Sequence, residues 1–252
     1  MSIQDIEAID VHSHYNRGSR YDTVVSDIYR ADIGYLKKMY DSANIELSFC
    51  STFASVLSPD DVFPENQFNY SLSQKTSWLY QWVVVEPRKK ETFDQAEYML
   101  RSPKCVGIKI HPLNHNYSIY DYGDMIFSFA EKHNTVVQMH PEDPAGIPSL
   151  VNRYPGMSLI IAHLGSVDHV EAIKKSKYGN IYVDTSGNAS IRNRIIEYAV
   201  EQVGADNILF GTDTYSAASQ RGRIEYAQIS FDDKQKILRT NALKLFEKKL
   251  LL

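Results

Sequence analysis

Two histidines and an aspartate stand on alternate positions near the start of the chain. The segment at 9–15 reads IDVHSHY and contains Asp10, His12 and His14. Alternate residues of a β-strand point to the same side, so both imidazoles would enter one space, with Asp10 one step deeper on that face. Imidazole nitrogens and carboxylate oxygens are common ligands of zinc and related divalent metals. The spacing therefore predicts part of a metal site, in which Asp10 could orient a ligand, make an ordinary buried hydrogen bond, or do both.

More groups of the same kind stand where other apolar runs end. Five of the eight histidines fall at the ends of predicted strands. Each alone has an ordinary explanation, because a histidine can satisfy a buried hydrogen bond and an aspartate can cap a helix or turn the chain. Several imidazoles and carboxylates at one site would be costly to bury without a shared partner, and a divalent cation is such a partner. Besides His12 and His14, these residues are His111, His140, His163, Asp184 and Asp213.

Short β-rich apolar runs alternate with longer segments of helical period along the chain. Eight runs are predicted to be strands, at 6–14, 45–51, 79–87, 106–112, 135–141, 158–165, 181–187 and 208–213. Such alternation is typical of a parallel sheet covered on both faces, and the count of eight favours a closed (β/α)8 barrel over an open doubly wound sheet. No G-x-G-x-x-G turn follows the first run, which removes the usual nucleotide-binding form of the open sheet. In a (β/α)8 barrel the carboxyl ends of the strands carry the active site, which is where the histidines fall.

The predicted helices lie at 35–43, 92–101, 121–133, 168–175, 191–203 and 232–249. Asp121, Asp168 and Ser190 are expected to cap three of them. The segment 56–77 is expected to be a long loop with a helix near its end, and 216–231 shows no clear period. No repeat, low-complexity tract or flexible linker marks a boundary, so we predict one barrel domain over 1–252.

The composition is that of an ordinary soluble globular protein and limits the kinds of partner. The net charge of −4 gives no basic surface for nucleic acid or an anionic membrane, and a small-molecule substrate is expected instead. No apolar run reaches the length of a membrane span, and residues 1–10 do not resemble a signal peptide. Cys50 and Cys105 both fall in apolar runs rather than in a disulfide framework, which is typical of a protein of the reducing cytoplasm.

Six motifs, in order along the chain, resemble those of the amidohydrolase superfamily. They are D-V-H-S-H, G-I-K-I-H-P, V-V-Q-M-H-P, I-I-A-H-L-G, L-F-G-T-D and T-N-A-L-K-L-F, and they extend from Asp10 to Phe246. The similarity is greatest to the amidohydrolase-related branch, which contains metal-dependent hydrolases together with decarboxylases of the aminocarboxymuconate-semialdehyde and resorcylate type. The resemblance implies a distorted (β/α)8 barrel with one divalent metal at the carboxyl ends of the strands, zinc in the simplest case and manganese as the alternative. It also implies that the metal ligands are His12, His14, His140 and Asp213.

The same resemblance assigns roles to the other groups at strand ends. His163 would lie near the metal as an acid–base group or as an electrophile that polarises the substrate. Binuclear branches of the superfamily place a carboxylated lysine at the end of strand 4, whereas Lys109 lies two residues before that end. A single metal is therefore expected, and His111 becomes the strand 4 group that faces the substrate.

The expected reaction is hydrolysis of a small amide, ester or lactone. A divalent metal lowers the pKa of bound water from about 16 to about 7, which supplies hydroxide near neutral pH. Asp213 would take a proton from this water and pass it to the leaving group, while the metal and His163 stabilise the developing oxyanion. The alternative on the same scaffold is non-oxidative decarboxylation of an aromatic or unsaturated acid, with Asp213 or His163 protonating the carbon. The short loops after strands 2 and 3 favour hydrolysis of a small substrate.

Three other functions fit the sequence less well. TatD-type nucleases share D-x-H-x-H but carry a metal-binding glutamate in a G-E-x-G-L-D stretch on strand 4, which this chain lacks. PHP phosphoesterases end with a D-x-H pair, where this chain has G-T-D-T. A non-catalytic metal barrel would fill every coordination position with protein ligands, whereas the predicted site faces an open barrel mouth.

Substrate contacts are expected from residues that follow strand ends. Arg17 and Arg88 could each bind a substrate carboxylate, because a guanidinium group matches its two oxygens. Asn114 and Tyr215 could line the pocket. Trp82 is expected to pack on the outside of its strand. A homodimer is common among such barrels, although no residue here requires one.

Overall fold

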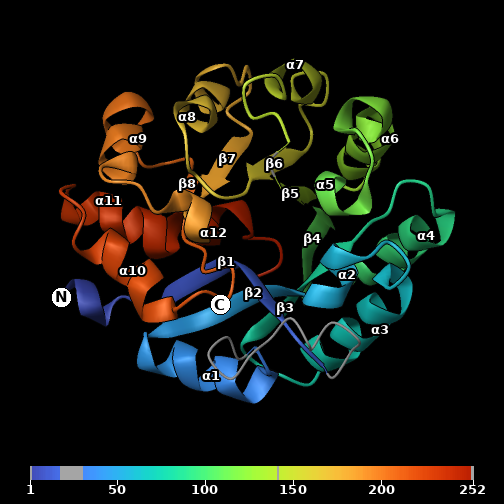
Figure 1. Ribbon diagram of the computed structural model, residues 1–252, viewed down its shortest axis with the longest axis horizontal. Coiled ribbons are helices and arrows are strands. Elements are labelled where there is room, and N and C mark those ends of the chain that lie inside the picture. Colours follow the sequence, from blue (N-terminus) through green and yellow to red (C-terminus); the bar gives the residue numbers. More distant parts are fainter. Residues whose placement is uncertain (1, 18–30, 141, 251–252) are drawn as a thin grey trace.

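Eight parallel strands follow one another around a barrel (Figure 1), which confirms the predicted (β/α)8 class. The structure, a computed structural model, describes residues 2–17, 31–140 and 142–250. Each strand pairs with the next one along the chain, and all eight predicted runs contain a strand. The strands are β1 (Ala8–Tyr15), β2 (Ile45–Thr52), β3 (Leu79–Val84), β4 (Cys105–Ile110), β5 (Val136–Met139), β6 (Ser158–Ile161), β7 (Ile181–Asp184) and β8 (Ile208–Leu209).

Helices alternate with the strands and surround the barrel (Figure 1). They are α1 (Ile33–Ser42), α2 (Phe53–Leu57), α3 (Val62–Ser73), α4 (Lys90–Met99), α5 (Pro112–His115), α6 (Ile119–Lys132), α7 (Pro148–Val151), α8 (Val167–Lys174), α9 (Ile195–Val203), α10 (Ala217–Glu225), α11 (Phe231–Gln235) and α12 (Asn241–Leu245). A π-helical segment at Lys236–Thr240 runs directly from α11 into α12, so most of the predicted helix at 232–249 is present as one continuous helical run over 231–245. None of the helices in the described ranges is both long and apolar enough to cross a membrane.

Two segments without a clear sequence period contain helices. Much of 56–77 is α3, which buries Glu65, Asn66 and Asn69 in place of a continuous apolar stripe. The amides of Asn66 and Asn69 donate to backbone carbonyls of β3 and β2, each at 2.8 Å. The segment 216–231 contains α10. Polar contacts therefore hold α3 against the barrel, and a hydrophobic period could not reveal them.

The predicted helix caps are wrong at three positions. Ser118 caps α6 through its side chain and Ser166 precedes α8, so Asp121 and Asp168 lie within the first turns of these helices. Ser190 belongs to a 3-10 turn that ends before α9 begins. An acidic residue in a first turn still interacts favourably with the helix dipole, which explains why Asp121 and Asp168 resembled caps.

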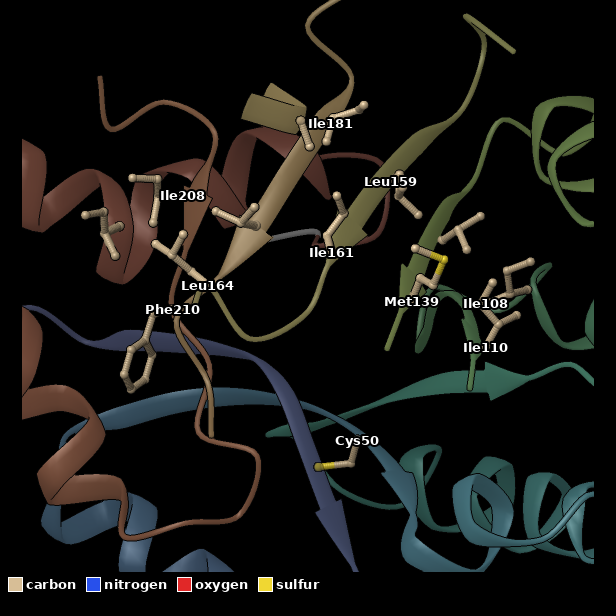
Figure 2. Close-up of a cluster of buried hydrophobic side chains, with 14 of the residues drawn as sticks. Cys50, Ile108, Ile110, Met139, Leu159, Ile161, Leu164, Ile181, Ile208 and Phe210 are labelled. Carbon is tan, nitrogen blue, oxygen red and sulfur yellow. The ribbon is translucent and has the colours of Figure 1, made fainter. Parts of the chain in front are cut away.

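Apolar side chains form an outer and an inner layer. In the outer layer, residues such as Ile108 and Leu159 point from the strands toward the helices (Figure 2). The inner layer fills the barrel and includes Phe49, Trp82 and, near the C-terminus, Phe246, whose ring centroid lies 4.9 Å from that of Phe49. Trp82 is thus inside the barrel, and the prediction that it packs outside is wrong. This filling leaves the carboxyl ends of the strands as the place where polar groups can gather.

β1 contains a bulge at Val11 and His12. Its register with β2 shifts between Asp10 and Ser13, as expected where one strand carries an extra residue. The Val11 carbonyl accepts hydrogen bonds from two side chains inside the barrel, Trp82 Nε1 at 2.9 Å and Gln138 Nε2 at 3.1 Å. These bonds satisfy a buried backbone acceptor at the bulge.

The bulge also separates Asp10 from the histidine pair. The Asp10 carboxylate accepts hydrogen bonds from Thr212 Oγ1 at 2.7 Å, from Thr212 N at 3.0 Å and from His12 N at 3.0 Å. Its bonds go to backbone and hydroxyl groups and not to an imidazole ring. The buried hydrogen bond predicted for Asp10 is confirmed, and through it Asp10 ties β1 to the segment after β8.

Backbone hydrogen bonds close the barrel between β1 and the end of β8. Val11 N donates to Phe210 O at 2.9 Å. The amides of Thr212 and Asp213 both donate to His12 O, at 3.2 and 2.7 Å. This closure places Asp213 directly beside His12.

We expect Gly107→Ala to destabilise the barrel. A Cβ at Gly107 would lie 2.3 Å from the carbonyl oxygen of Val136 and 2.6 Å from the Trp82 side chain, so β4 and β5 or the indole would have to move. Overpacking of this kind costs about 1–3 kcal/mol of unfolding free energy. Urea unfolding followed by circular dichroism measures the effect.

Gly222→Ala is the matched control. Nothing lies within 4 Å of a Cβ built at Gly222, which stands inside α10. That substitution should raise the unfolding free energy by about 0.5–1 kcal/mol, because alanine favours a helix over glycine. A Gly107→Ala protein as stable as the wild type would contradict the close approach of β4 and β5.

Candidate metal centre

Three side-chain donors from β1 and the β8 end converge on one point. His12 Nε2 lies 3.2 Å from His14 Nε2, and Asp213 Oδ1 lies 3.4 Å from His14 Nε2 and 3.7 Å from His12 Nε2. Ligands of a tetrahedral metal with bonds of about 2.0–2.1 Å are separated by roughly 3.3–3.4 Å. The three donor atoms therefore have the spacing that a common divalent ion requires.

Hydrogen bonds on the far side of each ring orient the two imidazoles. His12 Nδ1 lies 3.0 Å from Asp184 Oδ2, and His14 Nδ1 lies 3.0 Å from Ser51 Oγ. A carboxylate only accepts, so His12 Nδ1 carries the proton and Nε2 keeps a lone pair directed into the site. Burial lowers the pKa of His12 to about 3, helped by the charge of Lys109, and burial lowers the pKa of His14 well below its ordinary value. Both rings are thus neutral, as metal ligands must be.

The carboxylate of Asp184 orients the other groups of the site. From the sequence, a role in the site and an ordinary role as a helix cap or turn residue explained Asp184 equally well. It is completely buried at the end of β7. Besides His12, it accepts hydrogen bonds from Gln138 Nε2 at 3.3 Å, from His163 N at 3.1 Å and from Ser186 N at 3.0 Å. Burial alone would raise the pKa of this carboxyl, but His12, His163 and Ser186 hold it below its ordinary value. Asp184 is therefore ionised and has its hydrogen-bonding capacity used.

Asp213 and His163 occupy a backbone conformation that side chains rarely adopt. Their φ angles are +54° and +63°, in the left-handed region, and such strain is concentrated at functional sites. Asp213 Oδ2 faces His163 Nε2 at 4.0 Å. Burial raises the pKa of Asp213 to about 6, although His163 and Lys109 oppose the shift. A Cβ on Gly187, whose φ is +75°, would lie 2.8 Å from Asp213 Oδ2, so this glycine gives the pair its space.

His140 and His111 lie beside the convergent donors. Their rings stack with centroids 4.0 Å apart, and the His140 centroid is 5.1 Å from that of His163. His111 caps α5, because its Nδ1 accepts a hydrogen bond from Asn114 N at 3.2 Å. Among the described residues, the sets whose donor atoms lie within 4.8 Å of one another are His12, His14 and Asp213, and His12, His163 and Asp184. The position of His140 as fourth ligand stays a prediction, and so does that of His111 toward the substrate.

Lys109 reaches the site, which its place before the end of β4 did not indicate. Its side chain is completely buried, and its Nζ lies 2.9 Å from His12 Nε2. Burial lowers the pKa of Lys109 to about 8, while the carboxylates of Asp184 and Asp213 oppose the shift. The sequence could not show this contact, because it depends on which strands face one another across the barrel.

The predicted substrate arginines are both engaged by glutamates. Arg17 Nε donates to Glu65 Oε1 at 2.8 Å, and Arg88 Nε donates to Glu86 Oε1 at 2.6 Å. Both glutamates are buried, so each needs its arginine as a partner. Substrate binding by either arginine stays a prediction and would have to share the guanidinium with this pair.

Asn114 and Tyr215 lie near the groups predicted to act. The Asn114 amide donates to the backbone carbonyl of Val56 at 3.0 Å and also faces His111 Nε2 at 3.1 Å. Tyr215 is half-buried, and burial together with the charge of Asp213 raises the pKa of its hydroxyl. Their contact with a substrate stays a prediction.

The family model described as amidohydrolase matches residues 9–248, so the chain belongs to the amidohydrolase family and is an enzyme of that superfamily. The resemblance read from the sequence motifs is confirmed. No curated protein sequence matches the chain.

Solved structures with the same fold include decarboxylases and a protein described as a hydrolase. 5-Carboxyvanillate decarboxylase from Sphingomonas paucimobilis has a TM-score of 0.76 at 14% identity, over 96% of this chain and 99% of that one. Dihydroxybenzoic acid decarboxylase from Polaromonas sp. JS666, with bound manganese and 2-nitroresorcinol, has a TM-score of 0.73 at 19% identity, over 97% of this chain and 99% of that one. A protein from Pseudomonas putida described as 2-pyrone-4,6-dicarboxylic acid hydrolase has a TM-score of 0.73 at 16% identity, over 98% of this chain and 99% of that one. At these identities the likeness concerns the fold.

We expect Asp184→Asn to weaken metal binding by about 10- to 100-fold. An amide can donate to His12 Nδ1, which would move the ring proton to Nε2 and remove the lone pair needed for the metal. Calorimetric titration of metal-free protein with ZnCl2 and MnCl2 measures the change in Kd.

Asp206→Asn is the matched control, because Asp206 is exposed and pairs with Lys236 at 2.7 Å. Its Kd should equal that of the wild type. If Asp184→Asn folds normally and binds metal as tightly as the wild type, Asp184 does not set the tautomer of His12.

Proposed function

We propose that this protein is a metal-dependent hydrolase that cleaves a small amide, ester or lactone. His12, His14 and Asp213 would hold one divalent cation, with His140 completing the set. The observation that carries the proposal is the position of the Asp213 carboxylate, whose Oδ1 faces the two Nε2 atoms while Oδ2 faces His163 at 4.0 Å. One oxygen can therefore bind the metal while the other handles a proton.

The chemistry divides between the ion and the side chains. A divalent cation supplies Lewis acidity, which polarises a carbonyl oxygen and lowers the pKa of water toward neutrality. Asp213 Oδ2 accepts the proton of the attacking water and later donates it to the leaving group. Without a cation, burial raises the pKa of Asp213 to about 6. The positive charge of a bound cation would lower this pKa and favour the carboxylate form, which accepts the proton.

The tautomer of His163 favours an acid–base role over an electrophilic one. Its Nδ1 lies 3.1 Å from the carbonyl oxygen of Ser186, which only accepts hydrogen bonds. Nδ1 therefore carries the proton in the neutral ring, and Nε2, on the Asp213 side, offers a lone pair. In this form His163 takes a proton, and it can stabilise an oxyanion only after it has done so.

Decarboxylation is the second candidate on the same residues. Two of the solved structures with this fold, from Sphingomonas paucimobilis and Polaromonas, are named as decarboxylases of aromatic acids. Asp213 in its acid form could protonate the ring carbon that loses carbon dioxide. The manganese in the Polaromonas structure also supports offering manganese beside zinc.

The test offers substrates of both kinds to protein loaded with zinc or with manganese. The lactone 2-pyrone-4,6-dicarboxylate is the hydrolysis probe, and 2,6-dihydroxybenzoate and 5-carboxyvanillate are the decarboxylation probes. We expect about one equivalent of bound metal, proton release from the lactone in a pH-indicator assay, and no carbon dioxide from the acids. Asp213→Asn should reduce turnover by at least about 100-fold.

Asp206→Asn again serves as the control and should keep wild-type turnover. Carbon dioxide release from the aromatic acids without lactone cleavage would replace hydrolysis by the second candidate. Failure to bind either metal, measured by plasma mass spectrometry, would remove the metal-dependent mechanism altogether.

A further inference from the structure

Lys109 makes a contact that the proposed metal site does not explain. Its side chain is completely buried, and in the described part of the chain its Nζ has one hydrogen-bond partner, His12 Nε2 at 2.9 Å. No described carboxylate lies within 4.0 Å of this nitrogen to form an ion pair. A buried cation normally has such a partner, so its position beside a metal-binding imidazole requires a reason.

The lone pair of His12 Nε2 can bind either one N–H donor or one metal ion at a time. Asp184 fixes the ring proton on Nδ1, so the neutral ring has a single lone pair, on Nε2. An N–H group of Lys109 donates into that lone pair in the present arrangement. A metal ion bound to His12 would use the same lone pair.

We infer that Lys109 competes with the metal ion for His12, so that metal binds only when Lys109 Nζ leaves Nε2. The inference rests on the metal site of the proposed function and adds a residue that opposes metal binding at that site. Loss of the hydrogen bond and repulsion between a lysine cation and a divalent ion both act against binding. Lys109 therefore sets the affinity of the site for metal and is not itself a ligand.

A lysine that binds the metal would behave in the opposite way. If Lys109 were a ligand, through its own nitrogen or after reaction of that nitrogen with carbon dioxide, its removal would weaken metal binding. Competition predicts tighter binding instead, so the sign of the change in Kd separates the two roles.

The experiment titrates metal-free Lys109→Met protein with ZnCl2 and with MnCl2 in a calorimeter. Methionine keeps the length and the apolar stem of lysine but has no N–H group. We expect the Kd to fall by about tenfold or more relative to the wild type, at an unchanged stoichiometry. Lys109→Leu, tested in parallel, should show the same direction and guards against a defect particular to methionine.

Lys104→Met is the matched control. Lys104 precedes the same strand, and its Nζ donates to Ser77 O at 2.7 Å, away from the histidines. Its Kd should match that of the wild type within a factor of about two, because a distant charge is screened by solvent.

The outcomes separate this inference from the proposed function. Weaker metal binding in both Lys109 variants would make Lys109 a ligand, and an unchanged Kd would mean that its contact with His12 has no effect on binding. Either result overturns the competition and leaves the metal site standing. If neither the wild type nor any variant binds metal, the metal site fails and the competition fails with it.

Discussion

The site depends on one buried carboxylate, that of Asp184. Removing an ionised carboxylate from water is expensive unless donors surround it, and here donors come from β1, β5 and the segments that follow β6 and β7. Because these bonds involve both oxygens, the carboxylate cannot turn without leaving a donor unpaired. The orientation of His12, and through it the direction of the lone pair toward Asp213 and Lys109, follows from this fixed group.

The sequence predicted the features that are local in the chain. Each strand is a short apolar run, and His12 and His14 are two residues apart. The hydrophobic period was therefore enough to predict the strands, and the spacing was enough to predict the histidine pair. Asp213 could be predicted because it ends the last predicted strand. The bulge in β1 could not be predicted, since it lies in the pairing with β2 and not in the residue types. For that reason the sequence does not show that Asp10 bonds to Thr212 and to the backbone of His12 and not to an imidazole ring.

The rest of the site depends on contacts across the barrel. Arg17 and Arg88 appeared available for a substrate, but buried glutamates from other segments already engage them. Lys109 was set aside from its place in β4, yet its long side chain reaches His12 on the opposite part of the sheet. The identity of a residue indicates what it can do, and only the packing of distant segments decides which partner it meets.

The seam between β1 and the end of β8 has a consequence for how the chain assembles. Asp10 and Thr212, which it joins, are 202 positions apart, so the closing contacts span most of the polypeptide. Bringing such distant segments together costs chain entropy, although this cost grows only slowly with loop length. During synthesis, His12 and His14 emerge early and must wait for the final strand before they meet Asp213. The donors are thus completed by the same step that turns an open sheet into a ring, and a chain that lacks the β8 end presents only His12 and His14.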